Sequence, residues 1–326
     1  MIRSLARTLA VTLCLATPAW ADFPEAVTDH ILPGYVALAE ATSTLADTAT
    51  RTCDVAALRP AYQAVFDAWM GVQHLRFGPV EVDGRGLSIA FWPDPKGSGA
   101  RAQMALLKGD QAALAPDMFA QQSIAARGLF ALERLLYPIA DLPADPCPLI
   151  RATAADLART AQAISAEWQN SYAQTVMTAG EAGNTTYLTR PEVRQVLFTQ
   201  LVTALEFTYD SRLGRPLGSF SQPRPERAEA VASGRSLRNI TLSLQAQRAL
   251  VLALTPDAPL TIAGFDHALA LAEALDDPTL AGVATPEGRL KVEILQQAIA
   301  ALRDTVLAEL GPELDVAIGF NAADGD

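Results

Sequence analysis

Hydrophobic residues recur every three or four positions along most of this chain, which is the period of an amphipathic α-helix. The segment after Asp54, a favourable N-cap residue, shows this period in full and is expected to run to about Arg76. Its core-facing positions are Leu58, Tyr62, Val65, Trp69 and Val72. The same pattern predicts helices over residues 24–51, 122–137, 149–178, 189–209, 226–234, 236–254, 259–276 and 286–310.

Local signals mark several of these helix boundaries. Residues 189–192 (TRPE) form a capping box with a proline just inside the helix, and Thr285 precedes Pro286 in the same way. Pro33, which Gly34 follows, is expected to kink the first helix.

Two long segments lack the helical period. Residues 77–99 are rich in glycine, proline and aspartate, yet they contain Phe91 and Trp92. A loop of this length with large aromatic side chains packs on the core or belongs to a binding site. Residues 214–225 form a second long loop, whose role the sequence does not reveal.

Composition and length extend this picture to the whole fold. Hydrophobic residues make up 50% of the chain and aromatic residues only 6%, a balance typical of Ala- and Leu-rich helices rather than strands. About 300 residues are too many for one small bundle. The sequence therefore predicts an all-α fold of two packed helical-bundle domains, 22–180 and 181–326, linked near residues 180–184.

The first 21 residues have the three parts of a secretory signal peptide. Two arginines provide the positive region, and residues 5–16 are apolar but too short to span a bilayer. Ala19 and Ala21 satisfy the cleavage rule, so the cut is expected after Ala21. Lipidation at Cys14 is the weaker alternative, because no small residue immediately precedes that cysteine.

Charge and cysteine content narrow the functional classes. Removal of the signal peptide would remove two arginines and change the net charge from −11 to −13. An acidic protein without basic clusters is a poor candidate for binding nucleic acid or anionic membranes, and no later segment resembles a transmembrane helix. The two remaining cysteines, Cys53 and Cys147, are expected to form a disulfide in an oxidising compartment rather than stay as free thiols.

The familiar catalytic motifs are absent from the sequence. Its three histidines form no H-E-x-x-H pair, and there is no G-x-S-x-G elbow, P-loop, dinucleotide fingerprint or C-x-x-C. His30 and His267 are expected on ordinary helix surfaces. His74, near the end of an apolar helix, is expected to be a hydrogen-bonded core or capping histidine.

Several polar residues stand in unusual positions. Glu133 lies on a mostly apolar helix face, where burial raises the pKa of a carboxyl unless a cation or metal compensates. Its candidate arginine partners are Arg76, Arg127 and Arg134. Arg235 and Ser236 either cap a helix, or Arg235 binds an anion or a buried carboxylate.

Five blocks of the sequence carry a recognisable pattern: residues 69–81 (WMGVQHLRFGPVE), 90–97 (AFWPDPKG), 126–137 (ARGLFALERLLY), 226–240 (ERAEAVASGRSLRNI) and 317–326 (AIGFNAADGD). Together these blocks resemble the imelysin family. The resemblance spans nearly the whole mature chain. It implies two packed helical bundles with a site in the groove between them, and a bacterial periplasmic or outer-membrane-associated location.

The signature of that family is G-x-H-x-x-E. Gly128 and Glu133 match it, but Phe130 stands at the position of the histidine. An imidazole and a carboxylate three residues apart on one helix face can hold a divalent metal together, whereas phenylalanine has no lone pair to donate. The candidate residues of a metal or ligand groove are His74, Arg76, Trp92, Gly128, Glu133, Arg235 and Ser236.

Three functions are compatible with these residues. The first is a non-catalytic periplasmic binding or accessory protein linked to a metal such as iron or zinc. The second is a divergent imelysin-type metallopeptidase, in which His74 and Glu133 would hold a metal that activates water. The third is an envelope protein whose groove binds a peptide or protein partner. We favour the first over the second, because a catalytic metal needs more ligands than these.

Overall fold

The structure is a computed structural model and describes residues 22–316. Within these residues the fold is all-α, as predicted, with one isolated bridge between Ser219 and Gln222. The α-helices are α1 (Phe23–Glu25), α2 (Leu32–Arg51), α3 (Val55–Val72), α4 (Arg85–Ile89), α5 (Ser98–Lys108), α6 (Pro116–Ala120), α7 (Gly128–Leu136), α8 (Cys147–Glu167), α9 (Ala173–Met177), α10 (Arg190–Phe207), α11 (Gly214–Leu217), α12 (Ser236–Leu254), α13 (Pro259–Leu275), α14 (Pro286–Thr305) and α15 (Gly311–Glu313).

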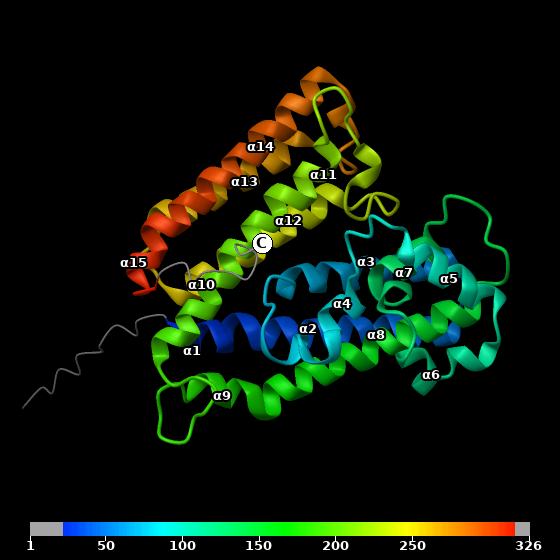
Figure 1. The fold of residues 1–326 in the computed structure, drawn as a ribbon, viewed down its shortest axis with the longest axis horizontal. Coiled ribbons are helices and arrows are strands. Elements are labelled where there is room, and N and C mark those ends of the chain that lie inside the picture. Colours follow the sequence, from blue (N-terminus) through cyan, green and yellow to red (C-terminus); the bar gives the residue numbers. More distant parts are fainter. Residues whose placement is uncertain (1–21, 317–326) are drawn as a thin grey trace, which may run out of the picture.

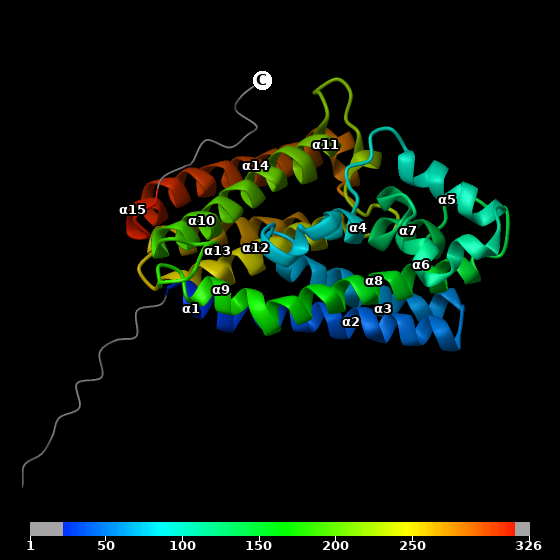
Figure 2. The same ribbon diagram turned by 60° about the horizontal axis from the view of Figure 1, so that its bottom comes forward.

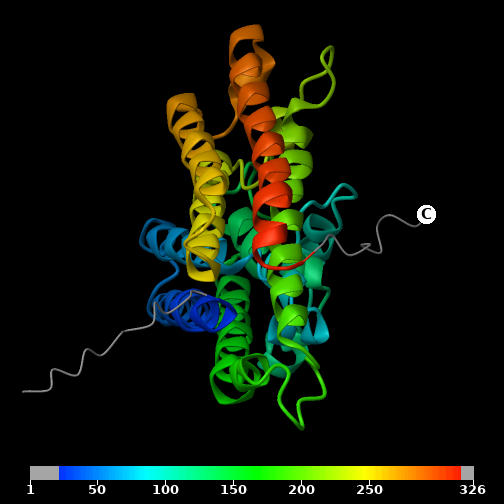
Figure 3. The same cartoon turned by 90° about the vertical axis from the view of Figure 1, so that its left-hand side faces the viewer.

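The longer helices form two sets that lie against each other. In the first set α2 packs along α3 and α8, and in the second α13 packs along α12 and α14 while α10 also contacts α14. Figure 1 shows the first set running lengthwise and the second crossing it obliquely, and Figures 2 and 3 show the same two layers from other sides. Helix α12 joins them through contacts with α3. The division into two domains at residue 180 stays a prediction.

The hydrophobic stripe of α3 is buried as its spacing predicted. Leu58, Tyr62, Val65 and Val72 are fully buried and Trp69 is 6% exposed. Burial of an aliphatic side chain such as Leu58 or Val65 stabilises the fold by roughly 1.5–3 kcal/mol. The helix ends at Val72 rather than near residue 76. There the chain turns tightly, with the amide of Leu75 donating to the Val72 carbonyl, and the next three side chains, Gln73, His74 and Leu75, are also buried.

The predicted helix over residues 122–137 begins six residues later, at Gly128. This glycine has a φ of +72°, and a Cβ placed on it would lie 2.2 Å from the carbonyl oxygens of both Ser88 and Ile89. Only glycine fits this close approach of two backbone segments. The glycine of the G-x-H-x-x-E pattern therefore has a packing role, because it lets α7 lie against α4.

Residues 226–234 were expected to be helical, but the structure contains only a short 3₁₀ turn, Pro225–Arg227, followed by further turns. Ala230 has a φ of +50°. This backbone directs Glu229 and Ser233 inward, where both side chains form hydrogen bonds. Tertiary hydrogen bonds therefore override the helix propensity of this segment.

Other boundary predictions have mixed outcomes. The hydroxyl of Thr285 accepts a hydrogen bond from the Gly288 amide at 3.2 Å, as predicted. Thr189 does not cap α10 with its side chain; instead Glu192 accepts from the amide of Leu188 at 2.8 Å. A π-helical segment, Ala26–Ile31, precedes α2, and Pro33 lies in the first turn of α2; the kink at Pro33 stays a prediction. No helix within residues 22–316 combines the length and apolar character needed to cross a membrane.

The predicted disulfide is present. Cys53 follows the end of α2, and Cys147 is the first residue of α8. Their Cα atoms lie 5.5 Å apart across 94 residues of sequence. The bond therefore fastens the ends of two helices that pack along each other.

Candidate functional site

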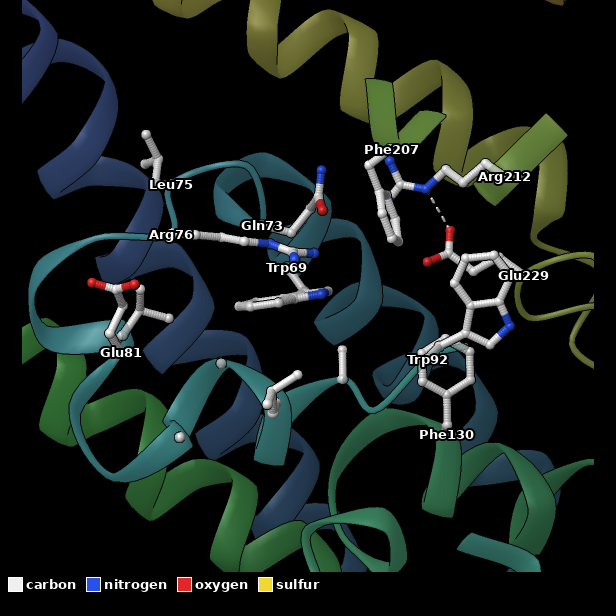
Figure 4. A pocket seen from close by; sticks show the side chains of 15 residues that line it. Trp69, Gln73, Leu75, Arg76, Glu81, Trp92, Phe130, Phe207, Arg212 and Glu229 are labelled. Carbon is white, nitrogen blue, oxygen red and sulfur yellow. Dashed lines mark hydrogen bonds and ion pairs between the residues drawn. The ribbon is translucent and has the colours of Figure 1, made fainter. Parts of the chain in front are cut away.

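A pocket of about 320 Å³ lies where the two sets of helices meet. Residues of α3, α4, α7 and the segments around them form most of its walls, and the C-terminal end of α10 closes the other side. Figure 4 shows the side chains of these elements around the shared space. The four aromatic rings in the lining are Trp69, Trp92, Phe130 and Phe207.

The predicted aromatic loop contributes Trp92 to this pocket. Its ring stacks on Phe130, with centroids 6.4 Å apart and an interplanar angle of 18°. It also meets Phe207 edge-on, at 5.9 Å and 84°. Phe130 packs edge-on against Phe66 as well. Phe130 is thus part of an aromatic wall of the pocket. That Phe130 replaces the histidine of the family signature stays a prediction.

A buried ion pair lines the inner end of the pocket. The Nε atom of Arg212 donates to Glu229 at 2.8 Å, and these residues are 1% and 4% exposed. Arg212 also donates to the Ser243 hydroxyl at 3.0 Å, while Asn239 donates to the same Glu229 oxygen at 3.0 Å. Because each charge has its counterion and further hydrogen bonds, the pair is well compensated.

Arg76, a predicted site residue, lies beside the aromatic rings. Its guanidinium carbon is 5.1 Å from the centre of the Phe207 ring, and its backbone amide donates to Gln200. Arg76 is exposed as a whole residue, but partial desolvation of its guanidinium by the pocket walls, together with the charge of Arg212, lowers its pKa. Among residues 22–316 no ion pair includes Arg76. This guanidinium therefore lacks a counterion within the described part of the chain.

Arg235 and Ser236 lie outside this lining and join the start of α12 to its surroundings. Arg235 is 1% exposed and donates to Asp67 at 2.5 Å and to the Asn239 side chain at 3.2 Å. Ser236 donates to the backbone carbonyl of Glu229 at 2.7 Å. Of the roles considered for Arg235, the structure shows the pairing with a carboxylate. A continuous polar chain thus runs from α3 through α12 to the buried ion pair.

Glu133 has none of its three predicted arginine partners. One of its carboxylate oxygens accepts hydrogen bonds from the Ser233 amide at 2.9 Å and from the Ser233 hydroxyl at 2.6 Å. Arg127 instead pairs with Asp156, and Arg134 donates to Gln103. Glu133 is 7% exposed, and burial raises its pKa despite these two hydrogen bonds. Its role in the structure is to hold the turn before α12 against α7.

Glu133→Gln is expected to change the pH dependence of stability more than stability itself. Gln can still accept the Ser233 hydrogen bonds, so the free energy of unfolding at pH 7 should change by no more than about 1–2 kcal/mol. Because the folded pKa of Glu133 is raised, the wild type loses stability as pH rises from the unfolded value through the folded one. The variant should lack this loss. Urea unfolding from pH 4 to pH 8 would measure it.

The control for this experiment is Glu181→Gln, at an exposed glutamate. It should reproduce the wild-type pH profile. An unchanged profile for Glu133→Gln as well would contradict the assignment of a raised pKa to Glu133.

His74 lies apart from Glu133, in contact with another histidine. Its Nε2 atom is 3.1 Å from Nε2 of His30, and it is 2% exposed, whereas His267 is exposed as predicted. His30, which was expected on an ordinary helix surface, is half-buried in the π-helical segment Ala26–Ile31, and its ring contacts that of His74. Burial lowers the pKa of His30 to about 4 and that of His74 well below its usual value, so both rings are neutral at neutral pH.

The donor set present does not fit a catalytic metal. His74 and Glu133 make their hydrogen bonds to different partners, His30 and Ser233. Residues 22–316 contain no group of three or more His, Cys, Asp or Glu residues placed to hold a metal ion. Protein zinc sites take three or four such ligands. We therefore derive no metal-dependent step for this protein.

Sequence reasoning missed the charged residues that organise this region, which are Asp67, Arg212 and Glu229. Asp67 interrupts the apolar α3, directly after Phe66. A charged residue within an apolar helix is the one sequence feature that could have indicated a buried ion pair here. This feature does not say which charge pairs with which, because the partners lie on different elements.

The signal-peptide cleavage site at Ala21 and the block 317–326 lie outside the described residues.

Comparison with known proteins places this architecture in a family. The imelysin family model matches residues 31–306. An iron-regulated protein A of Synechococcus elongatus is 23% identical over 311 residues, which cover 86% of this chain and 83% of the relative.

Two solved structures share the fold. An imelysin-like protein from Psychrobacter arcticum superimposes with a TM-score of 0.73 at 19% identity, covering 91% of this chain and 98% of the other. An iron-regulated protein A precursor from Parabacteroides distasonis gives a TM-score of 0.60 at 14% identity, covering 90% and 97%. The family match over most of the chain decides the assignment: this protein belongs to the imelysin family.

Proposed function

We propose that this protein is an exported, non-catalytic binding or accessory protein of iron uptake, and that its ligand site is the pocket between the two sets of helices. One observation carries the proposal. The pocket combines four aromatic rings with Arg76, while the described residues offer no group of three metal donors. Such a lining suits an organic ligand better than a bare metal ion.

The link to iron rests on the relatives. One curated relative and one solved structure of the same fold are named as iron-regulated proteins. Ferric iron prefers hard oxygen ligands such as carboxylates. Of the two glutamates in the pocket lining, Glu229 already pairs with Arg212. Iron would therefore be handled as a complex with an organic ligand.

Two features support a periplasmic location. The residues before Asp22 have the composition of a signal peptide. The Cys53–Cys147 disulfide is typical of oxidising compartments such as the periplasm. Association with the outer membrane is compatible with both features.

The proposal is tested by deleting the gene and measuring growth in iron-depleted medium. We expect the deletion strain to grow more slowly than the parent and to recover when iron salts or a plasmid copy are supplied. An equal growth rate of the two strains at every iron concentration would remove the link to iron uptake.

Metal content tests the non-catalytic part separately. Untagged protein purified from the periplasm should contain far less than one iron or zinc per chain, and Glu133→Gln and His74→Ala should not change this content. Near-stoichiometric metal that both substitutions remove would instead support the metallopeptidase hypothesis.

A further inference from the structure

The charged side chains around the pocket are not all paired. Arg76 and Arg212 line it together with Glu81 and Glu229, and the guanidinium of Arg215, which is not part of the lining, lies 5.7 Å from the centre of the Trp92 ring. The lining thus holds two guanidinium groups and two carboxylates, of which Arg212 and Glu229 pair with each other. An anionic group of a ligand at the Arg76 guanidinium would supply the ion-pair partner that this side chain lacks within the described part of the chain.

Among the described residues around the pocket, the guanidinium groups without an ion-pair partner are those of Arg76 and Arg215, whereas Arg212 is paired. Arg212 is neutralised by Glu229 at 2.8 Å. Arg76 and Arg215 take part in no ion pair among residues 22–316. The Nε atom of Arg215 is buried and has no hydrogen-bond partner in the described structure. Both guanidinium groups thus have unused hydrogen-bonding capacity beside the aromatic rings.

The rest of the lining selects a flat apolar group. Trp69, Trp92 and Phe207 surround the space that Arg76 enters, as Figure 4 shows. Aromatic rings pair favourably with one another beyond the area that they bury. The volume of about 320 Å³ lies at the lower end of the range for small-ligand sites.

We propose that the pocket binds a small aromatic carboxylate, with its carboxylate on the Arg76 guanidinium and its ring among Trp69, Trp92 and Phe207. Arginine matches the geometry of a carboxylate through paired N–H donors. This inference rests on the proposed function, because it names the ligand of the same pocket. Aromatic hydroxy acids belong to this class, and their phenolate and carboxylate oxygens are hard donors of the kind that ferric iron prefers.

The experiment is isothermal titration of the mature protein with salicylate. Phenol, which lacks the carboxylate, and cyclohexanecarboxylate, which lacks the aromatic ring, serve as comparison ligands. We expect salicylate to bind at least about tenfold more tightly than either one. Equal affinity for phenol would overturn the role of the charge, and equal affinity for cyclohexanecarboxylate would overturn the role of the rings. Undetectable salicylate binding at millimolar concentration would overturn the inference.

Variants locate the binding site. Arg76→Gln should weaken salicylate binding by about tenfold or more, and Trp92→Leu should also weaken it. The matched control is Arg51→Gln, at an exposed arginine of α2 that hydrogen bonds only to Thr48. Thermal unfolding followed by circular dichroism would show that each variant is folded. Wild-type affinity in folded Arg76→Gln would overturn the assignment.

Two further ligands distinguish related chemistries. The dipeptide Gly-Phe presents the same class of ligand as the C-terminus of a peptide, so tighter binding of Gly-Phe than of salicylate would support the inference with a peptide as the source. Tighter binding of phenyl phosphate than of salicylate would overturn the choice of a monoanion.

The outcomes of this experiment and of the growth experiment can be told apart. A deletion strain that needs iron, combined with a protein that binds no aromatic carboxylate, would overturn this inference alone and leave the proposed function standing.

Discussion

Protein that begins at Asp22 and has both Cys53 and Cys147 replaced by serine is expected to lose about 4–5 kcal/mol of unfolding free energy. The disulfide closes a segment of 94 residues, and a cross-link over such a long loop removes much conformational entropy from the unfolded chain. The folded state should change little, because the two residues lie at the ends of α2 and α8, which also pack along their lengths. Urea unfolding of the variant and the oxidised wild type would measure the difference.

Wild-type protein unfolded in the presence of a reducing agent serves as the control. Its unfolding midpoint should match that of the double serine variant, since both lack the cross-link. A loss below about 1 kcal/mol in the double variant would contradict the expectation and would mean that the unfolded state is already compact.

Arg212→Met is expected to lower the free energy of unfolding by about 3–5 kcal/mol. The substitution leaves the Glu229 carboxylate 4% exposed and without its cation, and it also removes the donor to Ser243. Met keeps much of the apolar stem of Arg212 but loses the guanidinium contacts with the Met70 sulfur and the Phe207 ring. Denaturant unfolding at pH 7 would measure the loss.

A second substitution separates the buried charge from the lost packing. Adding Glu229→Gln to Arg212→Met removes the isolated charge and keeps an acceptor for Asn239, so it should restore much of the stability. Arg248→Met breaks the more exposed pair with Asp266 and should change stability by less than about 1 kcal/mol. If the double variant were no more stable than Arg212→Met, the loss would have to come from packing rather than from the unpaired carboxylate.

In the candidate site, the sequence predicted several of the residues, whereas the partners of these residues became visible only in the structure. Arg76 and Trp92 were predicted from their blocks, and both line the pocket. Glu133 was expected to be buried, and it is, but its partner is Ser233, 100 residues away in sequence. Arg235 pairs with Asp67 across 168 residues. Pairings over such distances depend on how the two sets of helices pack, and a local pattern carries no information about that.

The sequence by itself determined the all-α class, most of the long helices, the disulfide and the family. The class, the helices and the disulfide follow from local or compositional properties: the helical period decides which face of α3 is buried, and Cys53 and Cys147 are the two cysteines that follow Cys14 in the chain. The family follows from the resemblance of longer blocks of the sequence and from the family match over residues 31–306. The tertiary structure alone decided that residues 226–234 would not be helical, that Gly128 serves close backbone packing, and that His30 meets His74. Over residues 226–234, contacts with distant segments outweigh a helix preference worth about 1 kcal/mol or less per residue. The other two features depend on partners far away in the chain, which a local pattern does not identify.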